Sequence, residues 1–344
     1  MKDLLVVGGG PAGLAAALNA ARAGLDVAVL EPRAAPIDKA CGEGLMPGGV
    51  AALHRLGVRP AGMPFRGIRY LDGRACADRQ ACATADFPDS PGLGLRRTEL
   101  HGALHRAALD AGVELVAARA RDVHQDGQQV SACGLRARYL IAADGLHSPV
   151  RRSLGLERTA PGPRRWGLRA HFPIAPWSEY VEVYWGSSGE AYVTPVAPDC
   201  VGVAFLGSSR EPYAQRLAAF PALRERLAGA AAGPVLAAGP LRQRVSRPVS
   251  GRVLLVGDAA GYLDALTGEG LSLGFRCAEA AVGAIVRSDP EQYVAEHRRI
   301  TRRYRLLTAA LVRATQPVPA RRAIVPLATH APWLFRAAVA QLAG

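Results

Sequence analysis

The chain has 344 residues, 49% of them apolar, which is enough for a sizeable buried core in roughly one to three domains. Its formal charge of +13 comes almost entirely from arginine, but the arginines form scattered pairs without interleaved aromatic residues, which argues against nucleic-acid binding. No apolar run is long enough to span a bilayer and none of the 6 cysteines belongs to a Cys-x-x-Cys pair, so we expect a cytoplasmic protein with reduced thiols and no metal site.

The first predicted elements form a β-α-β unit. Residues 3–10, "DLLVVGGG", are an apolar run that ends in glycines, which is typical of a buried parallel strand. A helix is predicted over 11–24, because Pro11 suits the first helical position, alanines fill the interior and Gly24 suits the end. A second buried strand is predicted over 25–31.

Elements of the same type recur further along the chain. The sequence predicts a helix over 97–112, a strand over 136–145, a strand over 252–258 and a helix over about 269–287. An Asp-Gly pair at 126–127 predicts a hairpin turn.

The sequence pattern changes over 66–92 and 156–245. There, short runs of alternating apolar and polar residues are separated by Gly, Pro and Ser, which is typical of antiparallel sheet. We therefore predict an α/β chain in which a Rossmann-like nucleotide-binding domain is interrupted twice by a smaller, mostly antiparallel β domain, with helices at the C-terminus. The expected divisions are 1–65, 93–155 and 246–290 for the nucleotide-binding domain, 66–92 and 156–245 for the β domain, and 291–344 for the helices.

A glycine motif joins the first strand to the first helix. Gly8 permits a tight turn, Gly10 lets a pyrophosphate approach the backbone, and Gly13 lets the helix pack closely on the strand. The N–H groups at the start of the helix attract the phosphates. Glu31 ends the second strand, where it can accept hydrogen bonds from a ribose, and its charge argues against a 2′-phosphate and hence against NADP in this site.

Three separated stretches accompany this motif, namely "LRRTEL" (95–100), "ADGLHSPVRR" (143–152) and "GDAAGYLDALTGEG" (257–270). With the glycine-rich start, they resemble the flavoprotein superfamily of p-hydroxybenzoate hydroxylase over roughly residues 1–290. "KACGEGLMP" (39–47) and the third stretch are most similar to its geranylgeranyl-reductase-like branch, which holds isoprenoid reductases and many FAD-dependent oxidoreductases and monooxygenases of secondary metabolism.

The resemblance implies non-covalently bound FAD and, by position, a role for several residues. Glu31 would meet the adenosine ribose, Arg97 the diphosphate region and Asp258 the ribityl or diphosphate region, while Asp144 falls in a motif that serves both FAD and NAD(P)H. No second glycine fingerprint is evident, so NAD(P)H would dock transiently. The expected cofactor-binding residues are Gly8, Gly10, Pro11, Ala12, Gly13, Glu31, Arg33, Cys41, Gly42, Arg97, Asp144, Gly257, Asp258, Gly268, Glu269, Gly270 and Leu271.

The tetrapeptide Gly-Glu-Gly-Leu occurs twice, at 42–45 and 268–271. The second copy starts a helix, whose N–H groups could stabilise the negative charge on the N1/O2 edge of a reduced flavin; Glu269 could equally be a first-turn acid that favours the helix dipole. In the resembled branch the first copy lies beside the flavin at the substrate cavity. Cys41 would then be a proton donor in a reductase or a residue that lines the pocket in an oxygenase.

Further catalytic candidates lie in the β domain. Arg169 and His171 alternate with apolar residues on one strand, so they share a face, and Tyr184 and Tyr192 lie on strands that we expect to be its neighbours. If they face the substrate, His171 and Tyr184 could orient a phenol or act as a general acid or base. The alternative is a solvated outer face.

The segment 291–314 predicts an amphipathic helix with arginines around an apolar stripe. Packing on the body of the protein is one use of that stripe, and weak contact with an anionic membrane surface is another.

The motifs predict an FAD-dependent oxidoreductase that acts on a small-molecule substrate. An NAD(P)H-dependent monooxygenase that hydroxylates or epoxidises a small apolar or aromatic substrate, such as a secondary metabolite, is the first choice. The alternatives are a reductase of carbon–carbon double bonds in an isoprenoid or other lipid-like substrate, and a non-catalytic FAD-binding protein.

Overall fold

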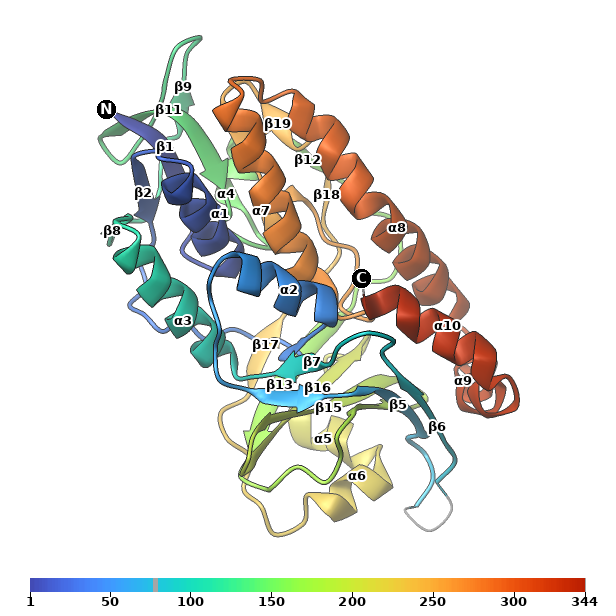
Figure 1. Ribbon diagram of the computed structural model, residues 1–344. Coiled ribbons are helices and arrows are strands. Elements are labelled where there is room, and N and C mark those ends of the chain that lie inside the picture. The colour runs from blue at the N-terminus through green and yellow to red at the C-terminus, as the bar shows by residue number, and fades with distance from the viewer. Residues whose placement is uncertain (77–79, 344) are drawn as a thin grey trace.

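The fold is described from a computed structural model, which covers residues 1–76 and 80–343 (Figure 1). A mainly parallel sheet with strand order β19-β20-β11-β1-β2-β8 forms the first layer, and only β19 runs antiparallel to its neighbour on this path. Its strands are β1 (Lys2–Val7), β2 (Val27–Leu30), β8 (Glu114–Val116), β11 (Leu135–Ala142), β19 (Val249–Ser250) and β20 (Val253–Leu255).

Both faces of this sheet are buried, which explains why the central strands contain apolar runs such as residues 4–7 on β1 and Val27–Leu30 on β2. On β1, Leu4 and Val6 pack against helices, while Leu5 and Val7 pack on the other face against a hairpin and a short helix. The helices on the first face are α1 (Pro11–Arg22), α2 (Pro47–Arg55), α3 (Arg97–Asp110), α7 (Gly270–Val286) and α8 (Gln292–Ala314). The elements on the second face are β9 (His124–Gln125), β10 (Val130–Ala132) and α4 (Pro149–Ser153).

A second sheet lies beyond the carboxyl ends of the parallel strands, in the order β17-β13-β16-β15-β14-β5-β6. It is antiparallel except where β14 pairs with β5. Its strands are β5 (Gly67–Asp72), β6 (Cys82–Asp86), β13 (Trp166–Phe172), β14 (Val181–Trp185), β15 (Gly189–Ala197), β16 (Cys200–Gly207) and β17 (Leu236–Ala238). Its outer face is covered by α5 (Tyr213–Ala218) and α6 (Pro221–Arg226).

Two small sheets connect the layers. The first consists of β3 (Gly44–Leu45), β4 (Met63–Phe65) and β7 (Gly92–Gly94), and the second of β12 (Glu157–Arg158) and β18 (Arg244–Val245). Because β3 contains the last two residues of the first Gly-Glu-Gly-Leu copy, this pairing fixes that loop at the junction of the two large sheets.

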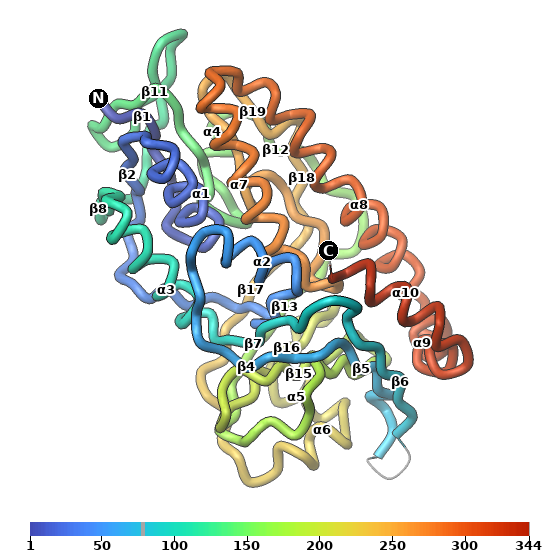
Figure 2. Tube along the Cα trace, viewed as in Figure 1, coloured from blue at the N-terminus to red at the C-terminus, as the bar shows by residue number. Residues whose placement is uncertain are grey.

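The C-terminal helices α9 (Val318–His330) and α10 (Pro332–Ala343) pack on the inner face of the second sheet near β5, β6 and β14 (Figure 2). Among the described residues no single helix is long and apolar enough to cross a bilayer, whereas α9 and α10 together meet that criterion by length and composition, with a bend of 104° between them.

The predicted fold class is confirmed: a Rossmann-like parallel sheet, a mostly antiparallel second sheet and C-terminal helices. The predicted helix over 97–112 is α3, the predicted helix over about 269–287 is α7, and the Asp-Gly pair turns between β9 and β10. Helix α2 was not predicted. Residues 77–79, within the predicted β segment 66–92, and Gly344 lie outside the described residues.

Candidate active site

A single cavity of about 690 Å³ connects the carboxyl ends of the parallel strands to the inner face of the second sheet. This edge of an open α/β sheet is where such folds bind their ligands. Most of the predicted cofactor residues line it, namely Gly8, Gly10, Pro11, Ala12, Glu31, Arg33, Cys41, Gly42, Arg97, Asp144, Gly257, Asp258, Gly268, Gly270 and Leu271.

The turn between β1 and α1 has no room for side chains. Gly8 has a φ of 103°, and a Cβ there would lie 2.5 Å from the carbonyl oxygen of Ala143. A Cβ on Gly13 would overlap the carbonyl oxygen of Gly8, so Gly13 does not line the cavity but lets α1 approach the turn. These contacts leave the first N–H groups of α1 facing the cavity, as a pyrophosphate site requires.

Glu31 lies beside this turn at the end of β2. Its Oε2 accepts a hydrogen bond from the Gly9 N–H at 2.9 Å, and its carboxylate forms an ion pair with Arg33, whose Nε lies 2.8 Å from Oε1. Burial alone would raise the pKa of Glu31, but the hydrogen bonds from Arg33 and Gly9 outweigh it and the pKa lies below its usual value. The carboxylate is therefore ionised and oriented at the cavity wall.

Arg97 and Asp144 approach the glycine turn from two other segments. The guanidinium of Arg97, at the start of α3, reaches to within 4.0 Å of a Cβ placed on Gly10. Asp144 follows β11, accepts a hydrogen bond from the Val150 N–H at 3.1 Å, and has its pKa raised by burial. Arg97 Nε and Asp144 Oδ1 are buried without a hydrogen-bond partner among the described residues, which marks both as groups for a ligand.

Asp258 lines the cavity at the end of β20, where Gly257 has a φ of 58°. Its Oδ2 lies 3.2 Å from Nζ of Lys39, one of only two lysines in the chain. Lys39 is not one of the predicted site residues. Lysine is rare in this arginine-rich chain, which could have drawn attention to Lys39. Its partner Asp258, however, is 219 positions away and could not be predicted from the sequence.

We predict that Asp258→Ala weakens FAD binding by about 10- to 100-fold, because a hydrogen bond to a charged group contributes about 1.5–3 kcal/mol. Flavin dissociation constants, from fluorescence quenching, measure the effect. Asp110→Ala, at the exposed end of α3, is the matched control. Equal dissociation constants for the two variants would show that Asp258 does not contact the cofactor. Asp264 is unsuitable as a control, since it forms an ion pair with the buried Arg165 at 3.0 Å.

The second Gly-Glu-Gly-Leu copy reaches the cavity with its backbone. Gly268 has a φ of 69°, and Gly268, Gly270 and Leu271 line the cavity where α7 begins. The Glu269 side chain does not line it; it is half-buried, and this burial raises its pKa. Of the predicted cofactor residues of this copy, Glu269 therefore does not line the cavity, and the N-terminal N–H groups of α7 are the feature that the copy presents to it.

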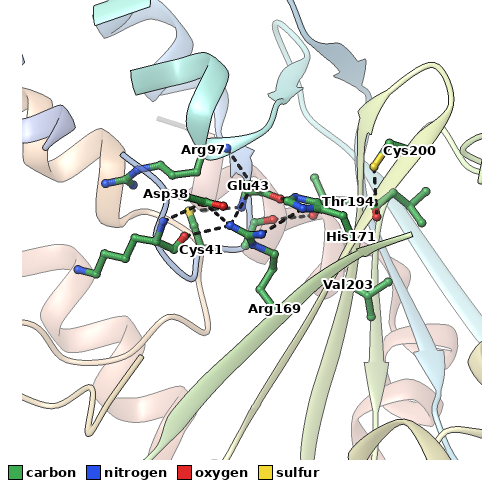
Figure 3. A network of polar contacts seen from close by, with 12 residues as sticks. Asp38, Cys41, Glu43, Arg97, Arg169, His171, Thr194, Cys200 and Val203 are labelled. Carbon is green, nitrogen blue, oxygen red and sulfur yellow. Dashed lines mark hydrogen bonds and ion pairs between the residues drawn. The ribbon is translucent and has the colours of Figure 1, made fainter. Parts of the chain in front are cut away.

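The first copy is anchored by its glutamate (Figure 3). Glu43 is 3% exposed and has a φ of 60°, which is uncommon for a residue other than glycine. Its Oε1 accepts a hydrogen bond from the Arg97 N–H at the start of α3 at 2.8 Å, and its Oε2 lies 2.7 Å from His171 Nε2. Arg169 lies 3.7 Å from Oε1 and forms an ion pair with Asp38. We call Asp38, Glu43, Arg169 and His171 the Glu43 cluster.

The Glu43 cluster holds Cys41 at the cavity. The Glu43 N–H donates to Cys41 Sγ at 3.4 Å, and the Thr194 hydroxyl of β15 donates to the Gly42 carbonyl at 2.8 Å. The loop is thus attached both to α3 and to the second sheet. The two identical tetrapeptides therefore differ in role. The first positions the side chain of Cys41, and the second presents the N-terminus of α7 to the cavity.

The prediction that Arg169 and His171 share a face is confirmed, and that face is not solvated. Both residues are buried, and only Arg169 lines the cavity. Arg169 Nη1 donates to His171 Nδ1 at 3.1 Å, so the Nε2–H of His171 donates to Glu43. Because both ring nitrogens form hydrogen bonds, the geometry favours a role for His171 in positioning Glu43 rather than a role as a general acid or base.

Removing the carboxylate of Glu43 is expected to destabilise the protein by about 3–5 kcal/mol, because it leaves the buried Nε2–H of His171 and an N–H at the start of α3 without their acceptor and removes a negative charge 3.7 Å from the buried Arg169. Chemical denaturation of Glu43→Ala measures the change in the free energy of unfolding. Glu179→Ala, which removes an ion pair from a carboxylate that is 76% exposed, should change it by at most about 1 kcal/mol. Similar values for the two variants would show that the Glu43 cluster does not stabilise the fold.

Tyr184 does not face the cavity, and its prediction as a catalytic residue is corrected. On β14 the neighbours Val183 and Trp185 line the cavity, so Tyr184 points to the opposite face. There its hydroxyl donates to Glu182 Oε2 at 2.7 Å. Nor is β14 a neighbour of β13, from which β16 and β15 separate it. Tyr192 on β15 does line the cavity.

The part of the cavity on the second sheet is mainly apolar. Its side chains come from the inner faces of β5, β14, β15 and β16, from the residue before α2, from the loop before α7 and from α10. They include Met46, Ile68, Tyr70, Val181, Val183, Trp185, Tyr192, Leu206, Leu266 and Leu342. Cys41, Gly42 and Gly268 line the same cavity as the nucleotide-binding turn, which brings the Cys41 thiol, the helix N-terminus and the apolar wall together.

Comparison with known proteins identifies the family. A sequence model described as an FAD binding domain matches residues 1–199. The menaquinone reductase of Mycobacterium tuberculosis is 31% identical over 316 residues, which covers 81% of this chain and 75% of that protein. The chain belongs to the p-hydroxybenzoate hydroxylase superfamily of FAD-dependent oxidoreductases. The digeranylgeranylglycerophospholipid reductase 1 of Methanopyrus kandleri is 31% identical to this flavoprotein over 321 residues, covering 83% of this chain and 82% of that protein, which confirms the geranylgeranyl-reductase-like branch.

Solved structures agree with the fold of this flavoprotein. A triple mutant of the flavin-dependent brominase Bmp2 has a TM-score of 0.84 at 18% identity and covers 100% of this chain and 94% of that chain. The halogenase PltM in complex with phloroglucinol and FAD has a TM-score of 0.78 at 18% identity, with 98% and 85% covered.

The residues of the site fit FAD. The glycine turn leaves no space for a Cβ at Gly8 or Gly13, and the carboxylate of Glu31 lies at the wall beside the turn. Arg97 and Asp144, both half-buried, each offer a buried atom without a partner among the described residues. NAD(P)H as a transient reductant is consistent with this family.

Proposed function

We propose that this flavoprotein reduces a carbon–carbon double bond in an isoprenoid or other lipid-like substrate, with NAD(P)H as the reductant. The observation that carries the proposal is the position of Cys41, which lines the cavity between the nucleotide-binding turn and the apolar wall. The names of the relatives, a menaquinone reductase and a digeranylgeranylglycerophospholipid reductase, support reduction of a lipid rather than oxygen transfer.

When bound, FAD supplies the two-electron transfer between NAD(P)H and a carbon of the substrate. Cys41 Sγ donates a proton to the neighbouring carbon, and the thiol is restored by a proton from water. The Glu43 cluster holds the sulfur in place, and the N–H groups at the start of α7 stabilise negative charge on the cofactor.

The wall of the cavity binds the apolar part of the substrate and excludes water. Ile68, Val181 and Val183 on β5 and β14 are buried, and Leu342 closes the wall from α10. Burial raises the pKa of Tyr70 to about 12, so this tyrosine stays neutral at physiological pH and adds no charge to the wall. Such a surface suits a hydrocarbon chain better than a charged metabolite.

The second candidate function is that of an NAD(P)H-dependent monooxygenase, which was the first choice from the sequence. The aromatic side chains of Tyr70, Trp185 and Tyr192 on the cavity wall favour it, because they could stack on a ring of a secondary metabolite. In that case Cys41 only lines the pocket and supplies no proton.

The two functions differ in their need for oxygen. We expect NAD(P)H consumption with a polyprenyl lipid under anaerobic conditions, and a product that has gained two hydrogens by mass spectrometry. Turnover that requires O2 and a product that has gained one oxygen atom would establish the monooxygenase instead.

A further inference from the structure

The C-terminal helices expose a group of large apolar side chains. Trp333 is 71% exposed, and Leu306 and Leu327 are each 63% exposed. We call the exposed apolar residues of α8, α9 and α10 the C-terminal apolar surface; its members are Leu306, Leu307, Leu311, Val318, Leu327, Trp333 and Leu334. Most of the exposed large apolar residues of the described chain belong to this surface.

This surface is not a loosely packed part of the core. The opposite side of the same helices is buried, where Val325 and Ala328 of α9 and Phe335 and Val339 of α10 pack on the second sheet. The ring of Phe335 lies 4.5 Å from that of Tyr70. One side of α9 and α10 is therefore packed against the second sheet, and Leu327, Trp333 and Leu334 on the other side are exposed to solvent.

The same segment is strongly basic. No aspartate or glutamate occurs after Glu296, whereas the arginines after it are Arg298, Arg299, Arg302, Arg303, Arg305, Arg313, Arg321, Arg322 and Arg336. On α8, Arg302 and Arg313 are four residues before and seven residues after Leu306, so they lie on the same side of the helix. Exposed apolar and cationic residues thus lie side by side on α8, where Arg302, Leu306 and Leu307 line a surface hollow together with Gln341 of α10.

We propose that the C-terminal apolar surface docks this flavoprotein on an anionic lipid bilayer, with α9 and α10 lying in the interface. Trp and Leu side chains flanked by arginines are the composition of interfacial helices, and each arginine near an anionic surface adds attraction. The bend of 104° between α9 and α10 suits two helices that lie on a membrane and are held by the sheet beneath them.

Charge distinguishes the bilayer from other partners. A second copy of the chain would bring two acid-free arginine surfaces together, and like charges across an interface are unfavourable. A nucleic acid would not cover Trp333, Leu334 and Leu327, which lie outward among the arginines. An anionic bilayer satisfies both the charge and the apolar area.

The surface is connected to the cavity through α10. Trp333, near the N-terminus of this helix, is exposed to solvent. Leu342, near its C-terminus, lines the cavity. If the proposed lipid reduction is correct, docking shortens the path of the substrate from the bilayer to the cavity. Docking itself does not depend on the reaction.

Co-sedimentation of the FAD-loaded protein with lipid vesicles tests the proposal. We expect binding to vesicles of phosphatidylcholine and phosphatidylglycerol to be at least about tenfold tighter than to phosphatidylcholine alone, and to weaken in high salt. Trp333→Ser/Leu334→Ser should weaken it by about tenfold or more. Arg302→Gln/Arg313→Gln should weaken it by about fivefold for each arginine removed.

The matched control is Arg106→Gln/Leu109→Ser on α3, which removes an exposed arginine and a leucine that is 50% exposed away from this surface. It should bind vesicles like the wild type. Binding that is absent from the wild type, or unchanged in Trp333→Ser/Leu334→Ser, would overturn the proposal. A dimer that forms without vesicles and dissociates in that variant would assign the surface to a second copy. Because no turnover is measured, these outcomes do not depend on the proposed reaction.

Discussion

Gly13→Val is expected to yield a folded protein that retains no FAD. A Cβ at position 13 overlaps the carbonyl oxygen of Gly8, so the side chain must push α1 away from the turn that follows β1. Overpacking against backbone costs about 3 kcal/mol or more, which weakens binding at least about a hundredfold. Flavin absorbance after gel filtration measures retention, and far-UV circular dichroism shows whether the variant is folded.

Gly102→Val is the control for this change, since it places the same side chain in a helix whose nearest neighbour there is the flexible end of Arg106, 3.4 Å from the Cβ. It should retain FAD at the wild-type level. A Gly13→Val protein that is fully loaded with FAD would contradict the role of the turn. Loss of FAD from both variants would mean that any valine in these helices disturbs the fold.

The nucleotide-binding site could be predicted because its residues are close together in the sequence. The strand, the glycines and the helix between residues 3 and 24 are neighbours in sequence, so their spacing alone indicates how the turn must fold. The same is true of Glu31 at the end of β2, which lines the cavity as predicted. Each of these residues acts within one β-α-β unit.

Long-range contacts could not be predicted in this way. Glu43 acts through Arg97 and His171, which are 54 and 128 positions away, and Lys39 acts through Asp258. The tetrapeptides at 42–45 and 268–271 have identical sequences, but the glutamate of the first is a buried anchor and that of the second does not line the cavity. Only the positions of their neighbours distinguish them.

Strand periodicity was informative about side-chain direction but not about what lies on each side. It correctly placed Arg169 and His171 on one face of β13. It could not show that Val183 and Trp185 face the cavity while Tyr184 faces Glu182, because both faces of this sheet are covered. A sheet with two buried faces gives no polar side by which its inner face could be recognised.

Cys41→Ser should lower the rate of double-bond reduction by about 10²- to 10⁴-fold, the usual loss when a general acid is removed. Serine is nearly isosteric with cysteine, so FAD binding and the position of the loop should be preserved. Its hydroxyl is, however, a far weaker acid than a thiol, whose ordinary pKa is about 8.5. Single-turnover oxidation of the reduced enzyme by a polyprenyl lipid measures this step, and reduction of the enzyme by NAD(P)H should be unaffected.

Cys82→Ser, at an exposed position on β6, is the matched control and should behave like the wild type. If Cys41→Ser reduces the lipid at the wild-type rate, Cys41 is not the proton donor and the proposed mechanism is wrong. If the wild type instead transfers oxygen from O2 to its substrate and the variant does so equally well, Cys41 only lines the pocket. That outcome would make the monooxygenase the function of this site, because the thiol donates no proton in that reaction.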